Sequence, residues 1–164
     1  MIVNRTTYID QLVRSRGNGL IKIVTGIRRS GKSFLLKKLF RQHLLDDGVQ
    51  DDHIIIIDME SRKNKAFKDP DYLLDYIDNV MKDDNTYYII IDEVQEVNDF
   101  VEVLSTLSVT EGTDVYVTGS NSRFLSSDVV TEFRGRGDEI HVWPLSFKEY
   151  MSVYDLSLIH ISEP

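Results

Sequence analysis

The 164-residue sequence contains no cysteine, only three prolines and one tryptophan, and no long hydrophobic run. Without cysteine the chain has neither disulfides nor thiolate metal ligands, which is ordinary for a protein of a reducing compartment. The first five residues lack the apolar core of a secretory signal, and no apolar run approaches the roughly 18 residues of a membrane span. We therefore expect a cytoplasmic protein with no membrane-bound segment.

Basic residues are also in the minority, because 19 Lys and Arg stand against 27 Asp and Glu, giving a formal net charge of −8. A surface that binds nucleic acid without sequence preference needs a basic face, so direct nucleic-acid binding is not expected of this chain. Hydrophobic residues make up 41% and charged residues 28% of the sequence, as in ordinary globular proteins. This length suits one α/β domain with a sizeable core.

Apolar runs of strand length alternate with helical patterns, which is typical of a parallel sheet with crossover helices. The predicted strands are Leu20–Thr25, Ile54–Ile57, Tyr87–Ile91, Asp114–Thr118 and Glu139–Trp143. Helices are expected from Lys32 to near Gly48, from the cap Asp69-Pro70, and from Asn98. The sequence thus predicts an α/β fold with one domain over residues 1–155. Residues 156–164 are expected to be a tail of non-native sequence at the end of a fragment of a longer protein.

Residues 26–33 read Gly-Ile-Arg-Arg-Ser-Gly-Lys-Ser and fit the phosphate-binding pattern G-x-x-x-x-G-K-[ST]. The pattern lies between a predicted strand and a predicted helix, where backbone N–H groups converge at the positive end of the helix dipole. Lys32 is expected to reach the β- and γ-phosphates, and the Ser33 hydroxyl to bind magnesium. The candidate nucleotide contacts are Gly26, Ile27, Arg28, Arg29, Ser30, Gly31, Lys32, Ser33 and Phe34.

Two carboxylates, Asp92 and Glu93, follow the apolar run at residues 87–91. Parallel α/β sheets bind ligands at the carboxyl ends of their strands, so both acids should face the crevice that holds the phosphate loop. Asp92 is predicted to bind magnesium opposite Ser33, and Glu93 to orient and deprotonate the attacking water. Taken alone, the two acids fit the start of a surface loop equally well. Paired with the phosphate loop, they favour a catalytic role, and hydrolysis over kinase chemistry.

Further candidates follow the last two predicted strands and the loop between them. Ser120 or Asn121, with Thr118 behind them, could sense the γ-phosphate or hold the lytic water, although an ordinary Gly-Ser-Asn turn explains the same residues. Arg134 and Arg136 could stabilise transition-state charge, in their own subunit or in a neighbour. A solvated basic turn is the alternative for this arginine pair.

Other motifs give less information about chemistry. No Asn-Lys-x-Asp motif for reading guanine is present, because Asn64-Lys65-Ala66-Phe67 lacks the acid, so ATP is preferred over GTP. The histidines show no metal-ligand spacing and are expected to be structural or exposed. They are His43, His53, His141 and His160.

With these motifs, the chain resembles the N-terminal ATPase domain of a widespread prokaryotic family of AAA-type P-loop ATPases, and also the wider group of nucleotide-dependent signalling ATPases. The likeness spans roughly residues 5–151. It rests on residues 26–33, 91–95, 118–122, 134–136 and 144–150. The resemblance implies a parallel five-stranded sheet flanked by helices, with the sensor strand between the Walker A and Walker B strands. It also implies ATP with Mg²⁺ as ligands, and a C-terminal domain that this chain lacks.

These expectations lead to one main function and two alternatives. The main prediction is Mg-dependent ATP binding and slow hydrolysis that drives or regulates a C-terminal or partner domain, with a homo-oligomer as one candidate assembly. A nucleotide-gated switch or docking module with negligible turnover is the first alternative. The second is a small-molecule phosphotransferase that uses Arg134 and Arg136 as a lid.

Overall fold

The computed structural model describes residues 3–120 and 137–153, and its strands form one five-stranded sheet in the order β2-β3-β4-β1-β5. All neighbouring strands pair in parallel. The strands are β1 Ile21–Thr25, β2 Ile54–Asp58, β3 Tyr87–Asp92, β4 Thr113–Thr118 and β5 Gly137–His141. Because β4 lies between β1, which precedes the phosphate loop, and β3, which ends at Asp92, the predicted fold class and strand order are confirmed.

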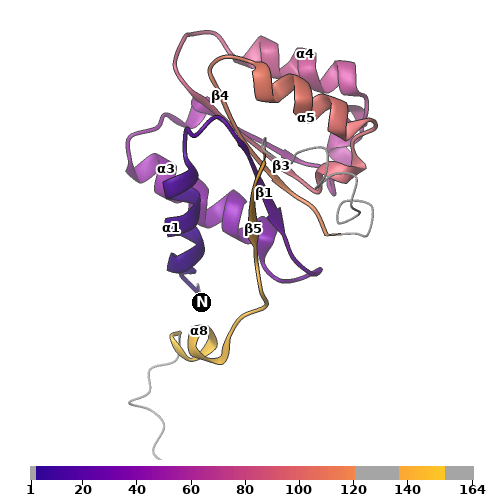
Figure 1. Ribbon diagram of the computed structural model, residues 1–164. Helices are drawn as coiled ribbons and strands as arrows, with labels where there is room; N and C mark the ends of the chain where they lie inside the picture. The colour runs from indigo at the N-terminus through magenta and orange to yellow at the C-terminus, as the bar shows by residue number, and fades with distance from the viewer. Residues whose placement is uncertain (1–2, 121–136, 154–164) are drawn as a thin grey trace, which may run out of the picture.

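Helices cover both faces of the sheet, with α4 and α5 on one side and α1 and α3 on the other (Figure 1). The α-helices are α1 Thr6–Ser15, α2 Lys32–Phe34, α3 Arg41–Asp46, α4 Pro70–Val80, α5 Phe100–Val109 and α8 Phe147–Met151. Shorter segments are π-helical η1 Leu35–Phe40 and the 3-10 turns η2 Asp51–His53, η3 Arg62–Lys68 and η4 Val94–Glu96. None of the described helices is long and apolar enough to cross a membrane.

The sheet separates two hydrophobic clusters, and β3 contributes to both. Ile89 and Ile91 pack in the cluster that includes α4 and α5, whereas Tyr88 and Ile90 pack in the cluster that includes α1 and η1. All six residues of β3 are buried, as expected for a central strand covered on both faces. The carboxyl end of this strand, where Asp92 lies, is therefore fixed by packing on two sides.

The helix after the phosphate loop changes geometry along its length. It begins as α2, continues as the π-helical η1 and ends as α3, with Gly48 at a φ of 92° just beyond it, as the predicted C-terminal glycine requires. Most of its apolar side chains pack into the core, but Phe34 is 41% exposed. A π-helical segment alters which side chains face the core, and an apolar pattern alone does not reveal it.

The ends of the other helices and strands agree only in part with the sequence-based predictions. Asp69 caps α4 as predicted, because its Oδ1 accepts hydrogen bonds from the backbone N–H groups of Asp71 and Tyr72 at 2.9 and 3.2 Å. By contrast, α1, η3 and α8 are helices that the sequence analysis does not include. The last strand was predicted over Glu139–Trp143 but spans Gly137–His141, because its pairing with β1 sets the register.

Candidate functional site

The phosphate loop connects β1 to α2 and is tightly wound. Gly26, Arg29 and Gly31 have positive φ angles of 145°, 66° and 93°. A Cβ atom added to Gly26 would lie 2.3 Å from the Val142 carbonyl oxygen, so this position requires glycine. Ser30 is buried, and its Oγ has no hydrogen-bond partner within the described residues. The loop therefore contains a buried polar atom that residues 3–120 and 137–153 leave unpaired.

Lys32 is the first residue of α2, and its ammonium group lies against the loop. Its Nζ donates to the carbonyl oxygens of Gly26 and Ile27 at 3.0 and 2.9 Å. Burial lowers the Lys32 pKa below its ordinary value, while the carboxylates of Glu93 and Asp92 oppose that shift. The ammonium group is thus held within the loop by weak neutral acceptors, which anionic oxygens could replace.

The end of β3 meets the phosphate loop at Asp92, which is fully buried. Its Oδ1 accepts hydrogen bonds from Ser33 Oγ at 2.8 Å and from Thr118 Oγ1 at 2.6 Å. Its Oδ2 lies 3.0 Å from Lys37 Nζ, as an ion pair. Lys37 also donates to Asp58 at the end of β2, at 2.9 Å. The structure therefore brings the predicted pair Ser33 and Asp92 into direct contact.

The oxygens of Ser33 and Asp92 suit magnesium, which prefers oxygen ligands and is usually bound through one or two carboxylates plus substrate phosphates. Within residues 3–120 and 137–153, no group of three or more His, Asp or Glu could hold a metal ion by itself. The donor set fits an ion that is bound together with nucleotide phosphates. It does not fit a structural metal site made by the protein alone.

Glu93 adopts a left-handed backbone conformation, with φ 54° and ψ 55°, which is uncommon outside glycine and often marks functional sites. Its backbone N–H donates to Thr118 Oγ1 at 2.8 Å. Its carboxylate accepts hydrogen bonds from Ser120 Oγ, at 2.9 and 3.1 Å, and from Gln95 Nε2. These contacts fix the carboxylate beside the phosphate loop.

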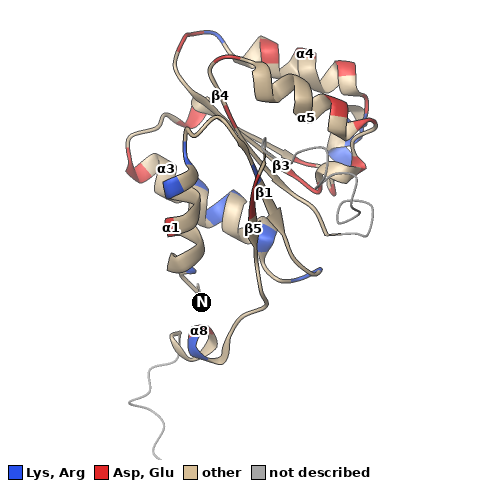
Figure 2. Ribbon diagram, viewed as in Figure 1, with Lys and Arg blue, Asp and Glu red and all other residues tan. Residues whose placement is uncertain are grey.

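A cavity of about 380 Å³ lies at the phosphate loop. Its lining residues are Arg28, Arg29, Gly31, Lys32, Ser33, Phe34, Glu60 and Glu93. Three of these side chains are cationic and two are anionic, so the lining has a net positive charge, which favours an anionic ligand. Figure 2 shows Lys and Arg along the helix that follows the loop, whereas Asp and Glu lie along α4.

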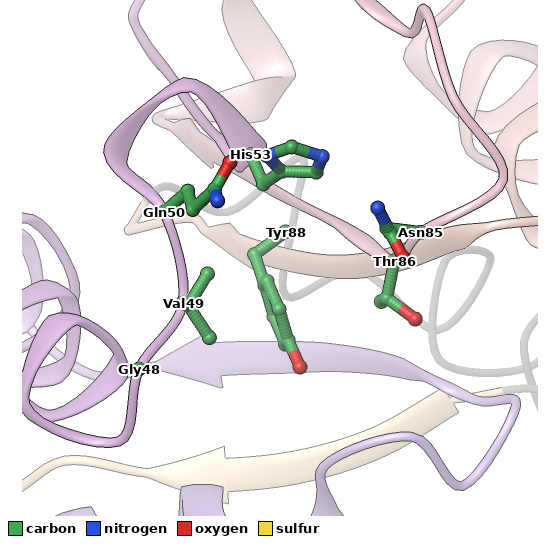
Figure 3. Close-up of a pocket in the computed structure, with 7 residues that line it drawn as sticks. All are labelled: Gly48, Val49, Gln50, His53, Asn85, Thr86 and Tyr88. Carbon is green, nitrogen blue, oxygen red and sulfur yellow. The ribbon is translucent and has the colours of Figure 1, made fainter.

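A second cavity, of about 320 Å³, lies beside the amino ends of β2 and β3 (Figure 3). It is lined by Gly48, Val49, Gln50, His53, Asn85, Thr86 and Tyr88. Its main polar side chains already have partners: His53 contacts Asp52 and Asp83, and the Tyr88 hydroxyl accepts from Arg16 Nε at 2.8 Å. Because no Lys or Arg lines this cavity, it lacks the positive charge that a triphosphate requires.

Some predicted residues cannot be placed, because Asn121, Arg134, Arg136 and the tail 156–164 lie outside the described residues. Thr118, expected behind the sensor residues, contacts both Asp92 and Glu93.

Sequence reasoning also missed three polar residues near the site: Arg5, Lys37 and Glu60. The sequence spacing could have identified Lys37, because it lies one helical turn after Ser33 and therefore on the same face of the predicted helix.

A family model described as "AAA domain" matches residues 18–151 of the chain. The chain belongs to this AAA domain family. Membership supports nucleotide binding and an ATPase-type function. The predicted resemblance is thereby confirmed at the level of the family.

Curated relatives of this AAA domain are longer proteins. The chain is 34% identical over 151 residues to an uncharacterized protein of Haemophilus influenzae, covering 92% of this chain and 38% of that protein. It is 30% identical over 133 residues to an uncharacterized protein of Methanocaldococcus jannaschii, covering 80% and 28%. The chain therefore spans well under half of the length of either relative.

Solved structures share the fold of this AAA domain at low sequence identity. AMPPCP-bound DnaA from Aquifex aeolicus superposes with a TM-score of 0.54 at 16% identity, covering 91% of this chain and 48% of that chain. A chain of Drosophila ORC bound to AT-rich DNA and Cdc6 gives 0.58 at 11% identity, covering 93% and 58%. C. elegans PCH-2 gives 0.54 at 16% identity, covering 82% and 41%. At these identities the likeness establishes the fold alone.

Proposed function

We propose that this AAA domain binds ATP together with Mg²⁺ at the phosphate loop and hydrolyses it slowly. The observation that supports the proposal is the 2.8 Å hydrogen bond from Ser33 Oγ to Asp92 Oδ1, which joins the phosphate loop to the acidic strand end. When bound, magnesium neutralises charge on the β- and γ-phosphate oxygens. Ser33 and Asp92 are the residues that would hold it.

Backbone N–H groups of the loop and the Lys32 ammonium group would hold the phosphates. Lys32 would exchange the carbonyl oxygens of Gly26 and Ile27 for phosphate oxygens, which form stronger, charge-assisted hydrogen bonds. Arg28 and Arg29 line the same cavity and add positive charge at its rim. A loop that is already wound into this shape loses little conformational entropy when it binds.

Glu93 would accept the proton of the attacking water. Its carboxylate is fixed by Ser120 and Gln95, and a well-positioned general base typically contributes about 10²–10⁴-fold to a rate. These hydrogen bonds use only part of the acceptor capacity of the carboxylate, because each oxygen has two lone pairs, so Glu93 can still accept from a water.

We further propose that the cycle drives or regulates a C-terminal or partner domain. The relatives extend well beyond the matched region, which leaves room for such a domain. Trp143, Leu145 and Phe147, which follow β5, are apolar yet 65%, 48% and 79% exposed. We assign residues 1–155 to the ATPase domain, with a homo-oligomer as one assembly, and we place the protein in the cytoplasm because it lacks cysteine.

A nucleotide-gated switch with negligible turnover is the second candidate. The hydrogen bonds from Ser120 and Gln95 to Glu93 favour it, because they give the carboxylate a structural role that requires no proton transfer. Phosphate release measured on the longest natural form of the protein separates the two functions. Undetectable release, with normal ATP affinity, would favour the switch.

The main test uses Lys32→Ala and Glu93→Gln with ATP affinity and phosphate release as paired measurements. We expect Lys32→Ala to weaken Mg-ATP binding by at least about 100-fold, since it removes charge-assisted hydrogen bonds to phosphate. We expect Glu93→Gln to retain affinity and lose at least about 100-fold in phosphate release. Lys38→Ala and Glu96→Gln, at exposed positions nearby, are the matched controls. Normal ATP affinity in Lys32→Ala would contradict the proposal.

A further inference from the structure

A buried arginine, Arg5, lies immediately before α1 and has not so far been given a role. Its side chain is only 3% exposed. Arginine is almost never fully buried unless it is paired, because removing its charge from water is costly. The partners of Arg5 therefore indicate what the surrounding structure requires of it.

The guanidinium group of Arg5 joins three segments that are far apart in the sequence. Its Nη1 donates to the Ser30 carbonyl oxygen at 2.6 Å, and its Nη2 donates to the Trp143 carbonyl oxygen at 2.5 Å. Its Nε donates to Glu149 Oε1 at 3.1 Å. The group also lies 4.5 Å above the ring of Tyr8. Arg5 thus connects the phosphate loop to the segment that follows β5 through hydrogen bonds.

On the loop side, the contact acts on a single peptide unit. The Ser30 carbonyl and the Gly31 N–H belong to the same planar trans peptide, so they point in opposite directions. By holding the carbonyl, Arg5 fixes the direction of the Gly31 N–H, which lies among the groups that line the phosphate cavity. A Cβ atom at Gly31 would lie 3.3 Å from Arg5 Nη1, so the two approach closely.

On the other side, the contact acts on the start of α8. Glu149 Oε1 accepts from Arg5, while Glu149 Oε2 accepts from the Ser146 backbone N–H at 2.8 Å in a capping box. The chain between β5 and α8 also contacts β1, because the Val142 N–H donates to the Thr25 carbonyl oxygen at 2.8 Å. Figure 1 shows α8 beside the N-terminal end of the chain.

We propose that Arg5 is a positioning residue that couples the phosphate loop to the segment Trp143–Met151, so that nucleotide binding at the loop changes the conformation of that segment. The inference rests on the proposed nucleotide site. When phosphate binds, rotation of the Ser30–Gly31 peptide moves the Ser30 carbonyl oxygen, which accepts from Arg5 Nη1. Because the guanidinium group is rigid and planar, it transmits this movement to Trp143 and Glu149. Arg5 itself touches no reacting atom.

The chain supplies its own reporter, because Trp143 is its only tryptophan. Calorimetry measures Mg-ATP affinity, and tryptophan emission is measured in parallel on the same protein. In the wild type we expect the emission to change with nucleotide and to saturate with the calorimetric affinity. In Arg5→Met and Arg5→Lys we expect affinity to fall about tenfold, as for loss of one charge-assisted hydrogen bond, and the emission change at saturation to fall by at least about half.

Two further variants keep the test independent of folding defects. Glu149→Ala leaves the contacts of Arg5 with Ser30 and Trp143 in place, so it should retain both the affinity and the emission change. Arg14→Met removes an exposed arginine from α1 and should behave as the wild type in both measurements. An emission change of full size in Arg5→Lys at saturating nucleotide would overturn the coupling, as would no emission change in a wild type that binds ATP. Absence of calorimetric binding in the wild type would instead overturn the proposed nucleotide site.

Discussion

Two buried and paired acids of this domain, Asp114 and Asp92, differ in their partners. Lys22, fully buried, contacts Asp114, and Asp114 Oδ2 also accepts from the Tyr116 hydroxyl at 2.8 Å and the Gly17 N–H at 3.0 Å. In that cluster the buried charges are paired with each other within the protein. Asp92 is equally buried, and its Oδ2 lies 3.0 Å from Lys37 Nζ as an ion pair. What distinguishes the candidate metal ligand from the structural acid is its contact with Ser33, which lines the phosphate cavity.

At the residue scale, Gly26 offers a prediction on stability. We expect Gly26→Ala to lower the free energy of unfolding by about 2–4 kcal/mol, because the added Cβ would meet the Val142 carbonyl at 2.3 Å and the φ of 145° disfavours any side chain. Urea denaturation followed by circular dichroism measures the change. Gly17→Ala is the control, since its φ of 69° is also strained but no atom lies within 4 Å of the added Cβ. It should cost only about 1 kcal/mol. Equal losses in the two variants would contradict the contact with Val142.

At the scale of elements, the two edges of the sheet have different roles. The carboxyl ends of β1 and β3 form the phosphate cavity, whereas turns at the amino ends of β2 and β3 are joined by His53. Its ring contacts Asp52 at 2.7 Å and Asp83 at 2.8 Å and stacks on Tyr87, with ring centroids 4.4 Å apart. This arrangement ties η2 to the loop between α4 and β3. Contacts of the His53 ring therefore stabilise the edge at the amino ends of the strands. At the carboxyl ends, the polar groups line a cavity that is suited to a ligand.

The His53 contacts predict a pH dependence of stability. Hydrogen bonds to Asp52 and Asp83 raise the pKa of His53 above its ordinary value, although partial desolvation opposes them. A raised folded-state pKa contributes stability that is fully present below about pH 6.5 and is lost as pH rises through the folded-state pKa. We expect the stability difference between the wild type and His53→Gln to shrink as the pH increases from about 6 to 9, measured by urea denaturation at each pH. Asp83→Asn should reduce this pH dependence while keeping the histidine. A difference that grows with pH would contradict the assignment.

At the scale of the whole molecule, the nucleotide site depends on the packing of the entire sheet. Parallel strands deliver Lys32 and Asp92 to one edge because β1 and β3 run in the same direction, with β4 between them. A ligand that binds only this assembled edge must stabilise the folded state. The site and the fold are thus linked thermodynamically.

This linkage predicts a thermal shift with Mg-ATP. At a nucleotide concentration about 100 times Kd, the stabilisation is about 2.7 kcal/mol, which for a domain of this size raises Tm by roughly 5–10 °C. Differential scanning fluorimetry with and without Mg²⁺ measures it. The shift should be absent in Lys32→Ala, and Asp92→Asn should remove the part that depends on Mg²⁺. An equal shift in Lys32→Ala would mean that nucleotide binds elsewhere.

How far sequence alone predicts this domain depends on the range of the interactions involved. The phosphate loop is readable because strand, turn and helix are contiguous, so Lys32 and Ser33 follow from local spacing. The alternation of apolar strand-length runs with helical patterns also predicts the parallel sheet. Asp69 predicts the start of α4. By contrast, α1 begins without a side-chain cap, and the π-helical geometry of η1 depends on packing.

The amino-acid sequence by itself determined the phosphate loop, the acid pair at residues 92 and 93 and the α/β class, because each is encoded within a few neighbouring residues. Only the tertiary structure decided that Ser33 contacts Asp92, that Lys37 joins two strand ends, and that Arg5 contacts residues 25, 138 and 144 positions away. Contacts of this length arise when the sheet and both helical layers pack together. No local pattern records them, since the chain entropy that opposes such contacts is overcome only by burial across the whole domain.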